Sequence, residues 1–228
     1  MLVKWGSIIV KGSGKLGGHV FSSGQSGASV HTSARARNPQ TLFQQNVRSR
    51  FTKLTQAWRD LTEGQRESWY DAESSFSRAN RFGDVVTLSG KNLFESLNIN
   101  RQIIGLAVLN TAPLPSEIPK NRVDVVEIDQ SLGTISIKGE FASSQKYVIV
   151  GTKGLSQGVR ESQDELRRLG ITNSEFDGGQ IRFIDTQYSR YVGRFGLPIV
   201  GRKIFIGTYS ISTSGQRSPN SVVQAVFV

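Results

Sequence analysis

The clearest hydrophobic pattern in this chain of 228 residues lies between residues 38 and 82. Apolar side chains recur there at intervals of three and four, which places them on one face of a helix. These side chains are Phe43, Val47, Phe51, Leu54, Trp58 and Leu61. Asn38 is a good N-cap, and Pro39 suits a first helical turn because it has a fixed φ and no N–H. The pattern therefore predicts a first helix that begins at Asn38–Pro39.

Two more helices are predicted by their start and stop signals. Thr62 and Gln65 have the spacing of a capping box, so a second helix should run from about Glu63 to Phe76, with Trp69 on its apolar face. Together the first two helices form a hairpin with an aromatic-rich face between them. A third helix should follow Ser89, bury Leu93, Phe94, Leu97 and Ile104, and stop at Gly105.

Residues 1–37 are rich in Gly and Ser, with short β-like runs at 6–11, 19–22 and 28–32 joined by glycine turns. These runs bury too little apolar surface to be stable alone, because an isolated hairpin is marginal in water. The segment is predicted to be an extended arm that must lie on a partner. A disordered tail is the alternative, and the recurring Val, Ile and Phe disfavour it.

The apolar period changes from about 3.6 to 2 beyond the proline-rich stretch 111–121. Strands are predicted at 123–128, 134–137, 146–150, 181–184, 203–212 and 221–228, with a short helix from Ser162 to Gly170. The spacing fits a small antiparallel sandwich similar to an immunoglobulin or fibronectin type III domain. The predicted fold is α+β: arm 1–37, helical domain 38–110, linker 111–121 and β-sandwich 122–228.

The net charge of +10 is concentrated in the first quarter of the chain. Residues 1–59 hold nine of the 28 basic residues and no acid, and the first acid is Asp60. Such a segment suits an acidic protein surface or a polyanion. Nucleic acid is the secondary candidate, because the cations are interleaved with Gln, Ser and Thr instead of forming a dense run. The candidate contact residues are Lys4, Lys11, Lys15, Arg35, Arg37, Arg48, Arg50 and Lys53.

Candidate chemistry is sparse, and we expect neither an enzyme nor a cofactor. The run Gly12–Lys15 lacks both the first glycine and the hydroxyl of a phosphate-binding loop. His19 and His31 have no nearby acid or cysteine with which to hold a metal, and the chain contains no cysteine at all. No apolar run is long enough to cross a bilayer and no signal peptide is present, so we expect cytoplasmic synthesis and no membrane partner.

Four motifs occur in a characteristic order between residues 12 and 100. They are Ser13-Gly14-Lys15-Leu16-Gly17-Gly18-His19-Val20-Phe21, Arg37-Asn38-Pro39-Gln40-Thr41 with Gln45, Val47, Arg48 and Phe51, Trp58-Arg59 with Leu61, Thr62, Gln65, Arg66 and Trp69, and Leu88-Ser89-Gly90-Lys91-Asn92 with Phe94 and Asn98. This order resembles a group of structural proteins of tailed bacteriophages, including phages that infect Bacteroidetes, which often carry a C-terminal immunoglobulin-like module.

The resemblance implies a virion component at the head or the head–tail junction, such as an oligomeric ring or an auxiliary capsid protein. Its partners would be capsid, portal or tail subunits and further copies of itself, and it would be made in the cytoplasm of the bacterial host. The alternative is a DNA-packaging or DNA-coating protein that uses the basic first quarter. A host-surface binding module that uses the sandwich loops is a third possibility, disfavoured because those loops carry few aromatic residues.

Overall fold

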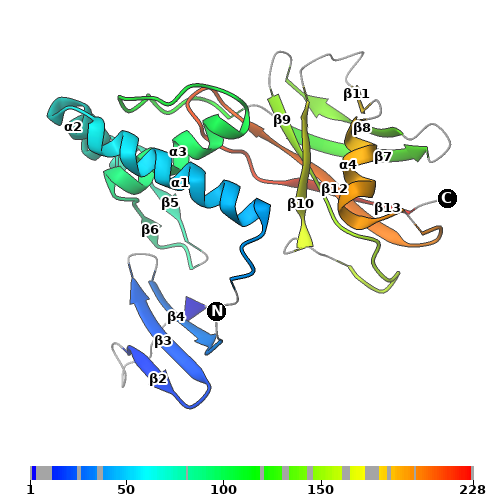
Figure 1. The fold of residues 1–228 in the computed structure, drawn as a ribbon, viewed down its shortest axis with the longest axis horizontal. Coiled ribbons are helices and arrows are strands. Elements are labelled where there is room, and N and C mark those ends of the chain that lie inside the picture. The colour runs from blue at the N-terminus through cyan, green and yellow to red at the C-terminus, as the bar shows by residue number, and fades with distance from the viewer. Residues whose placement is uncertain are drawn as a thin grey trace. The chain divides into compact units, whose positions relative to one another are not determined.

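The computed structural model describes residues 2–3, 12–24, 27–34, 38–80, 82–118, 121–129, 134–142, 146–160, 165–172, 180–183, 186–197 and 199–226 (Figure 1). The fold is mixed α+β with antiparallel sheets, as predicted. Two compact units divide the chain: Met1–Ser96 with Leu109–Pro113, and Leu97–Val108 with Leu114–Val228. This boundary differs from the predicted linker, since it passes through the third helix and assigns the last turns of that helix to the β unit.

The N-terminal segment forms a four-stranded antiparallel sheet in the order β1-β4-β3-β2 (Figure 1). Its strands are β1 (Leu2–Val3), β2 (Gly14–Leu16), β3 (His19–Gly24) and β4 (Gly27–Thr32). The predicted runs 19–22 and 28–32 are confirmed as strands, whereas 6–11 lies outside the described residues.

The prediction of an extended arm was wrong in one respect, because the segment pairs with itself. The register joins Leu16 to His19, which leaves Gly17 and Gly18 as a two-residue hairpin loop. Gly17 takes φ 56°, and a glycine adopts this left-handed conformation without the steric cost that a Cβ would bring. Gly17 and Gly18, which were predicted to be a glycine turn, therefore close a tight hairpin.

Helix α1 (Leu42–Asp60) begins after Thr41, so the predicted start at Asn38–Pro39 was wrong. Gln40 has φ 49°, which is incompatible with a right-handed helix. The Thr41 hydroxyl accepts a hydrogen bond from the Gln44 N–H at 3.3 Å, and the Gln44 side chain accepts one from the Thr41 N–H at 3.3 Å. This capping box fixes the first turn three residues beyond the predicted one.

Helix α2 (Glu63–Asp71) has the predicted capping box of Thr62 and Gln65. It ends before the predicted Phe76, because the backbone tightens into a 3₁₀ turn, η1 (Ser74–Phe76). A two-stranded hairpin follows, made of β5 (Arg78–Ala79) and β6 (Val85–Val86).

The core of the first unit needs helix α3 (Gly90–Ile103) in addition to the helical hairpin. The rings of Trp69 and Phe94 meet edge-on with centroids 5.3 Å apart, and Trp58 lies 5.3 Å from Phe94. The Trp69 indole N–H donates to the Asn110 carbonyl at 2.9 Å, which satisfies the one polar atom of this buried side chain. The predicted hairpin therefore does not close its core alone.

Among its described residues, the second unit contains two antiparallel sheets, the last turns of α3 and one further helix (Figure 1). One sheet has the order β11-β8-β7, with β7 (Asn121–Asp129), β8 (Thr134–Phe141) and β11 (Gln180–Phe183). The other has the order β10-β9-β12-β13, with β9 (Lys146–Gly151), β10 (Arg167–Thr172), β12 (Lys203–Ile211) and β13 (Ser221–Val226). The predicted strands in these ranges are confirmed.

Two elements of the second unit differ from the prediction. Residues 167–172 form strand β10, whereas a helix was predicted from Ser162 to Gly170, of which 162–164 lie outside the described residues. Leu166 and Leu169 imitate a helical spacing, but they pack against two different apolar clusters, and the register shifts between Arg168 and Gly170. Helix α4 (Thr186–Phe195) was not predicted.

The main core of this unit gathers buried residues from both sheets and from α4. Ile137, Ile149 and Ile206 are among its fully buried side chains, and Tyr191 of α4 packs with them. A second cluster joins Ile104, just after α3, to the opposite side of the β9–β12 pair. Gly105 then ends the helix with φ 76°, as predicted.

Candidate protein-docking surface in the N-terminal region

The structure describes four of the eight predicted contact cations. Lys15 is exposed on β2, and Arg48, Arg50 and Lys53 lie on α1. Lys4, Lys11, Arg35 and Arg37 lie outside the described residues. Within the part of the chain that is described, no ion pair involves any of the four described cations.

The cations of α1 do not share one face. At 3.6 residues per turn, Arg48 and Arg50 point about 160° apart, with Lys53 about 60° from Arg50. The Arg48 guanidinium donates to the Asn38 side-chain oxygen at 2.8 Å. The positive charge is therefore spread around the helix and does not form a row that could follow a phosphate backbone.

The predicted apolar stripe of α1 is buried along only half of its length. Leu54, Trp58 and Leu61 belong to the core, as predicted. Phe43, Val47 and Phe51 were predicted to be buried with them, but they are 55%, 36% and 44% exposed. Helix length explains the difference, because the 9 residues of α2 span about 14 Å and the 19 residues of α1 about 28 Å. Because α2 turns back directly after α1 and is about half as long, it cannot reach the first half of α1.

The N-terminal sheet carries a second apolar surface that was not predicted from the sequence. Residues opposite each other in the register share a face, so Lys15, Val20 and His31 lie on one side of the sheet. The other side carries Leu16, Phe21, Ala28 and Val30. Leu16 is 72% exposed, and no residue of β2, β3 or β4 is buried.

The signal for this surface is present in the sequence once the turn is known. The glycine pair between Leu16 and His19 fixes which residues face each other, and alternation then separates Phe21 from Val20. A shift of one residue would exchange the two faces.

Since the register also places His19 and His31 on opposite sides, the two histidines cannot share a metal ion. Among the described residues, no group of three His, Asp, Glu or Cys side chains could hold one.

The polar loop between β12 and β13 is occupied by internal hydrogen bonds. The Ser214 hydroxyl lies 2.8 Å from that of Ser116 and 2.6 Å from that of Ser212. The Gln216 side chain accepts from the Ser116 N–H at 2.7 Å, and the Ser218 hydroxyl accepts from the Ser210 N–H at 2.9 Å. These side chains hold the loop in place, and their hydrogen-bonding groups are engaged within the unit.

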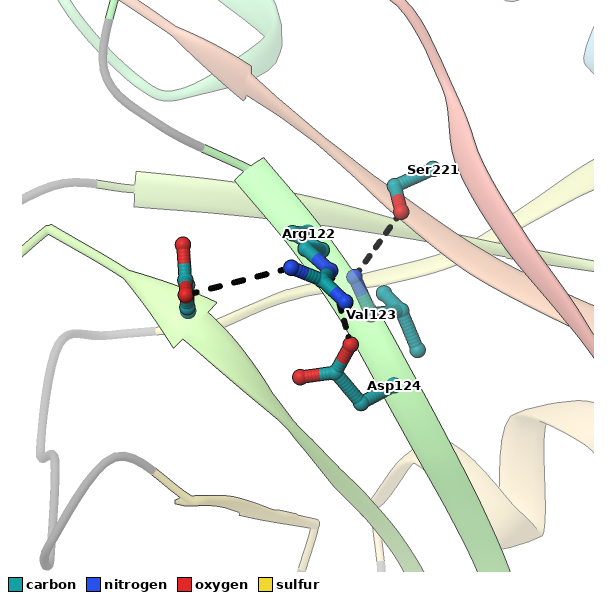
Figure 2. A network of polar contacts seen from close by, with 5 residues as sticks. Arg122, Val123, Asp124 and Ser221 are labelled. Atoms are coloured by element: carbon teal, nitrogen blue, oxygen red, sulfur yellow. Dashed lines mark hydrogen bonds and ion pairs between the residues drawn. The ribbon is translucent and has the colours of Figure 1, made fainter.

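Two acidic residues of β7, Asp124 and Glu127, are paired with cations of the same sheet. Figure 2 shows Arg122 beside Asp124, with 2.9 Å between Nε and Oδ1, and the Val123 N–H donating to the Ser221 hydroxyl at 2.8 Å. Glu127 lies 2.6 Å from the Lys138 ammonium. Asp124 and Glu127 therefore each have a separate cationic partner at the surface. Exposed pairs of this kind contribute little to stability.

Comparison with known proteins identifies no relative by sequence. The chain matches no protein-family model and no curated protein. In the part of the chain that is described, no helix is long and apolar enough to span a bilayer.

Two solved structures align with parts of the chain. The β-1,2-glucanase from Parabacteroides distasonis aligns with 50% of this chain and 14% of its own, at 14% identity and a TM-score of 0.28. The catalytically inactive OgpA from Akkermansia muciniphila, in complex with an O-glycopeptide (glycodrosocin) substrate, aligns with 64% of this chain and 38% of its own, at 12% identity and a TM-score of 0.30. The chain spans well under half the length of both proteins, and these scores carry no argument about its activity.

Proposed function

We propose that this protein is a structural subunit of a tailed-phage particle that its N-terminal region attaches to neighbouring subunits. The observation that carries the proposal is the exposed apolar stripe formed by Phe43, Val47 and Phe51 on the first half of α1. Apolar surface that continues a core stripe into solvent is typical of a protein–protein interface. The amphipathic sheet β1–β4 adds a second such surface to the same region.

The place in the particle follows from the resemblance of residues 12–100 to tailed-phage structural proteins. We infer a ring or an auxiliary capsid component at the head or the head–tail junction, present in several copies and in contact with capsid, portal or tail subunits. No catalytic role is required of such a subunit.

The arrangement of charge favours a protein partner over DNA. An apolar stripe with Arg48 and Arg50 on its two sides suits an interface with an apolar centre and a polar rim. A DNA-binding helix would instead direct its cations together at phosphates. The packaging or coating role therefore remains the second candidate.

We infer that the second unit is an immunoglobulin-like or fibronectin type III-like sandwich. The support is its connectivity, because the first, second and fifth of the seven strands that are described make one sheet, and the third, sixth and seventh lie in the other. The immunoglobulin constant domain divides its strands in this way, with its fourth strand beside the fifth. Here the fourth strand, β10, pairs with the third, and α4 occupies the connection between the fifth and the sixth.

The proposal is tested by particle incorporation. Three versions of the gene are compared in the genome that encodes the particle. They are wild type, the double variant Val47→Asp with Phe51→Asp, and the control Val85→Asp. The control alters a valine of β6 that is 75% exposed. Wild type and Val85→Asp should band with purified particles at a fixed copy number. The double variant, once circular dichroism shows that it is folded, should stay in the soluble fraction.

Two results would contradict the proposal. Wild-type protein that is missing from the particles would exclude a virion component. Particles that take up the double variant as well as wild type would exclude α1 as the attachment surface.

A further inference from the structure

The loop between α4 and β12 carries an exposed apolar tip, formed by Leu197, Ile199 and Val200. We propose that this loop tip inserts into the surface of a bilayer that contains anionic lipid. The inference goes beyond the proposed function and does not rest on it. It differs from the expectation of no membrane partner, which considered only segments that cross a bilayer, because a contact at the bilayer surface needs no such segment.

The loop tip gathers large aliphatic side chains at one turn. Leu197, Ile199 and Val200 are 76%, 62% and 68% exposed. The Ile199 carbonyl accepts from the Arg202 N–H at 3.1 Å and Gly201 has φ 77°, so the chain makes a β-turn with Val200 at its corner. Single exposed apolar residues are common in proteins, but three within four positions form a patch that indicates a contact surface.

The loop is held in place by the neighbouring segment 152–160. The Gln157 side chain donates to the Gly201 carbonyl at 3.2 Å, and Leu155 and Lys203 are joined by backbone hydrogen bonds of 2.8 and 3.2 Å. Together with the hydrogen bond of the turn, these contacts satisfy part of the polar backbone of the loop. The cost of moving the loop tip out of water is lower for that reason.

Cations lie on both sides of the loop tip. Arg194 and Arg202 are exposed and stand before and after it in the chain. From Thr186 to Val228 the sequence has five basic residues and no acid: Arg190, Arg194, Arg202, Lys203 and Arg217. Long cationic side chains that flank an apolar insertion can remain at the lipid phosphates while the apolar part lies deeper. The charge therefore complements an anionic lipid surface.

The chemistry of the loop tip favours lipid over a pocket in another protein. Protein interfaces draw most of their binding energy from Trp, Tyr and Arg, and Leu and Val are under-represented among the residues that dominate binding. The described side chains of the loop tip are all aliphatic, without an aromatic ring or a hydrogen-bonding group. Hydrocarbon is the environment that asks for no hydrogen-bonding group from a side chain.

The size of the loop tip indicates weak binding by a single copy. Its three side chains have fewer carbon atoms than a myristoyl chain, which alone gives only marginal and reversible membrane binding. A second signal is needed for measurable binding, and the cations beside the loop tip supply it when the lipid is anionic.

The test compares binding of purified full-length protein to vesicles of phosphatidylcholine alone and of equimolar phosphatidylcholine and phosphatidylglycerol, by co-sedimentation. The variant Ile199→Ser with Val200→Ser removes two apolar side chains and leaves the net charge unchanged. The matched control, Val85→Ser with Leu114→Ser, removes two that are 75% and 86% exposed elsewhere.

We expect wild type and the control to bind the mixed vesicles at least about tenfold more tightly than the loop variant, because the variant loses the burial of two aliphatic side chains. Wild type should bind phosphatidylcholine alone at least about tenfold more weakly than the mixed vesicles, because the second signal is missing.

A second measurement reports insertion directly, since the basic first quarter of the chain can hold the protein on anionic vesicles by charge alone. The sequence has no cysteine, so Val200→Cys can carry a single environment-sensitive NBD dye. Leu114→Cys is the control position. It lies two residues before Ser116, whose N–H donates to Gln216 beyond the far end of β12 from the loop tip. The dye at position 200 should brighten on the mixed vesicles, and the dye at position 114 should not.

Three results would overturn the inference. One is wild-type protein that does not bind the mixed vesicles. Another is a loop variant that binds them as tightly as the matched control. The third is a dye at position 200 that stays unchanged on vesicles that do bind the protein, because the protein would then be held by charge without insertion of the loop tip.

Discussion

Gly90 lies at the point where the first turn of α3 meets the backbone of α2. A Cβ at this position would stand 2.7 Å from the Tyr70 ring and 3.0 Å from the Trp69 carbonyl carbon. The Gly90 N–H also donates to the Glu73 carboxylate at 2.6 Å, which holds the helix start in this place. Gly90 therefore permits a close approach between α3 and α2. Its position in the sequence, directly after Ser89, does not predict this contact.

We expect Gly90→Ala to lower the free energy of unfolding by about 1–3 kcal/mol, the usual cost of overpacking. Gly64→Ala is the matched control, because Gly64 lies within α2 with open space around its Cβ position. That substitution should be neutral or stabilising by up to about 1 kcal/mol. Urea unfolding of both variants measures the difference, and equal effects would show that the α2–α3 contact is looser than described.

Tyr191 makes the stability of the second unit depend on pH in the alkaline range. Burial, with a smaller contribution from Tyr188, raises the pKa of Tyr191 to about 12 from its ordinary value of 10.0. The unfolded chain loses this proton near pH 10, whereas the folded chain keeps it until about pH 12. Stability from this group is therefore complete below pH 10 and is lost as the pH rises from 10 to 12.

We expect the free energy of unfolding of wild type to fall more steeply than that of Tyr191→Phe between pH 10 and 12. The difference in slope should approach about 1.4 kcal/mol per pH unit, the value for one proton. Because Tyr147 and Tyr209 also have raised pKa values from burial, the comparison between the two proteins isolates the contribution of Tyr191. Parallel slopes would mean that the Tyr191 hydroxyl is not protected from ionisation by the fold.

At the scale of elements, the sequence predicted what local chemistry determines. The Thr62–Gln65 box and Gly105 mark ends that neighbouring backbone atoms alone can fix, and both are confirmed. The start of α1 was missed because two suitable caps, Asn38 and Thr41, stand close together and only the φ of Gln40 decides between them. Strand β10 and helix α4 depend on long-range packing, which periodicity does not contain.

The candidate site was predicted only in part for the same reason. The excess of cations is a property of composition and could be read directly. The exposure of Val47 and Phe51 follows from the length of α2, which ends earlier than its apolar pattern suggested. The apolar face of the sheet requires the register set by Gly17 and Gly18.

The cap of α1 gives a test of the corrected helix start. Thr41→Ala removes the side chain that accepts from the Gln44 N–H, so the free energy of unfolding should fall by about 1 kcal/mol. Asn38→Ala removes only an exposed contact with Arg48 and should cost less than about 0.5 kcal/mol. Urea unfolding followed at 222 nm compares the two, and a larger loss for Asn38→Ala would restore the earlier start.

At the scale of the whole molecule, the proposed attachment surface is separate from the side chains that form the described cores. The buried side chains of the first unit come from α1, α2, α3 and their connections, and those of the second from its two sheets, α4 and the end of α3. Strands β2, β3 and β4 contribute no buried side chain. The described cores therefore do not depend on these three strands.

Deletion of residues 1–37 tests this separation. Since the deletion removes no described core residue, the free energy of unfolding of the remaining chain should change by less than about 1 kcal/mol, within the range of surface changes. Association of the purified protein, measured by light scattering as mass against concentration, should disappear, because every contact that uses the sheet is lost. A chain that keeps its association after the deletion would place the interface elsewhere. A loss of more than about 2 kcal/mol would make the sheet part of the folded core, and a segment with that role could not be released to a neighbouring subunit.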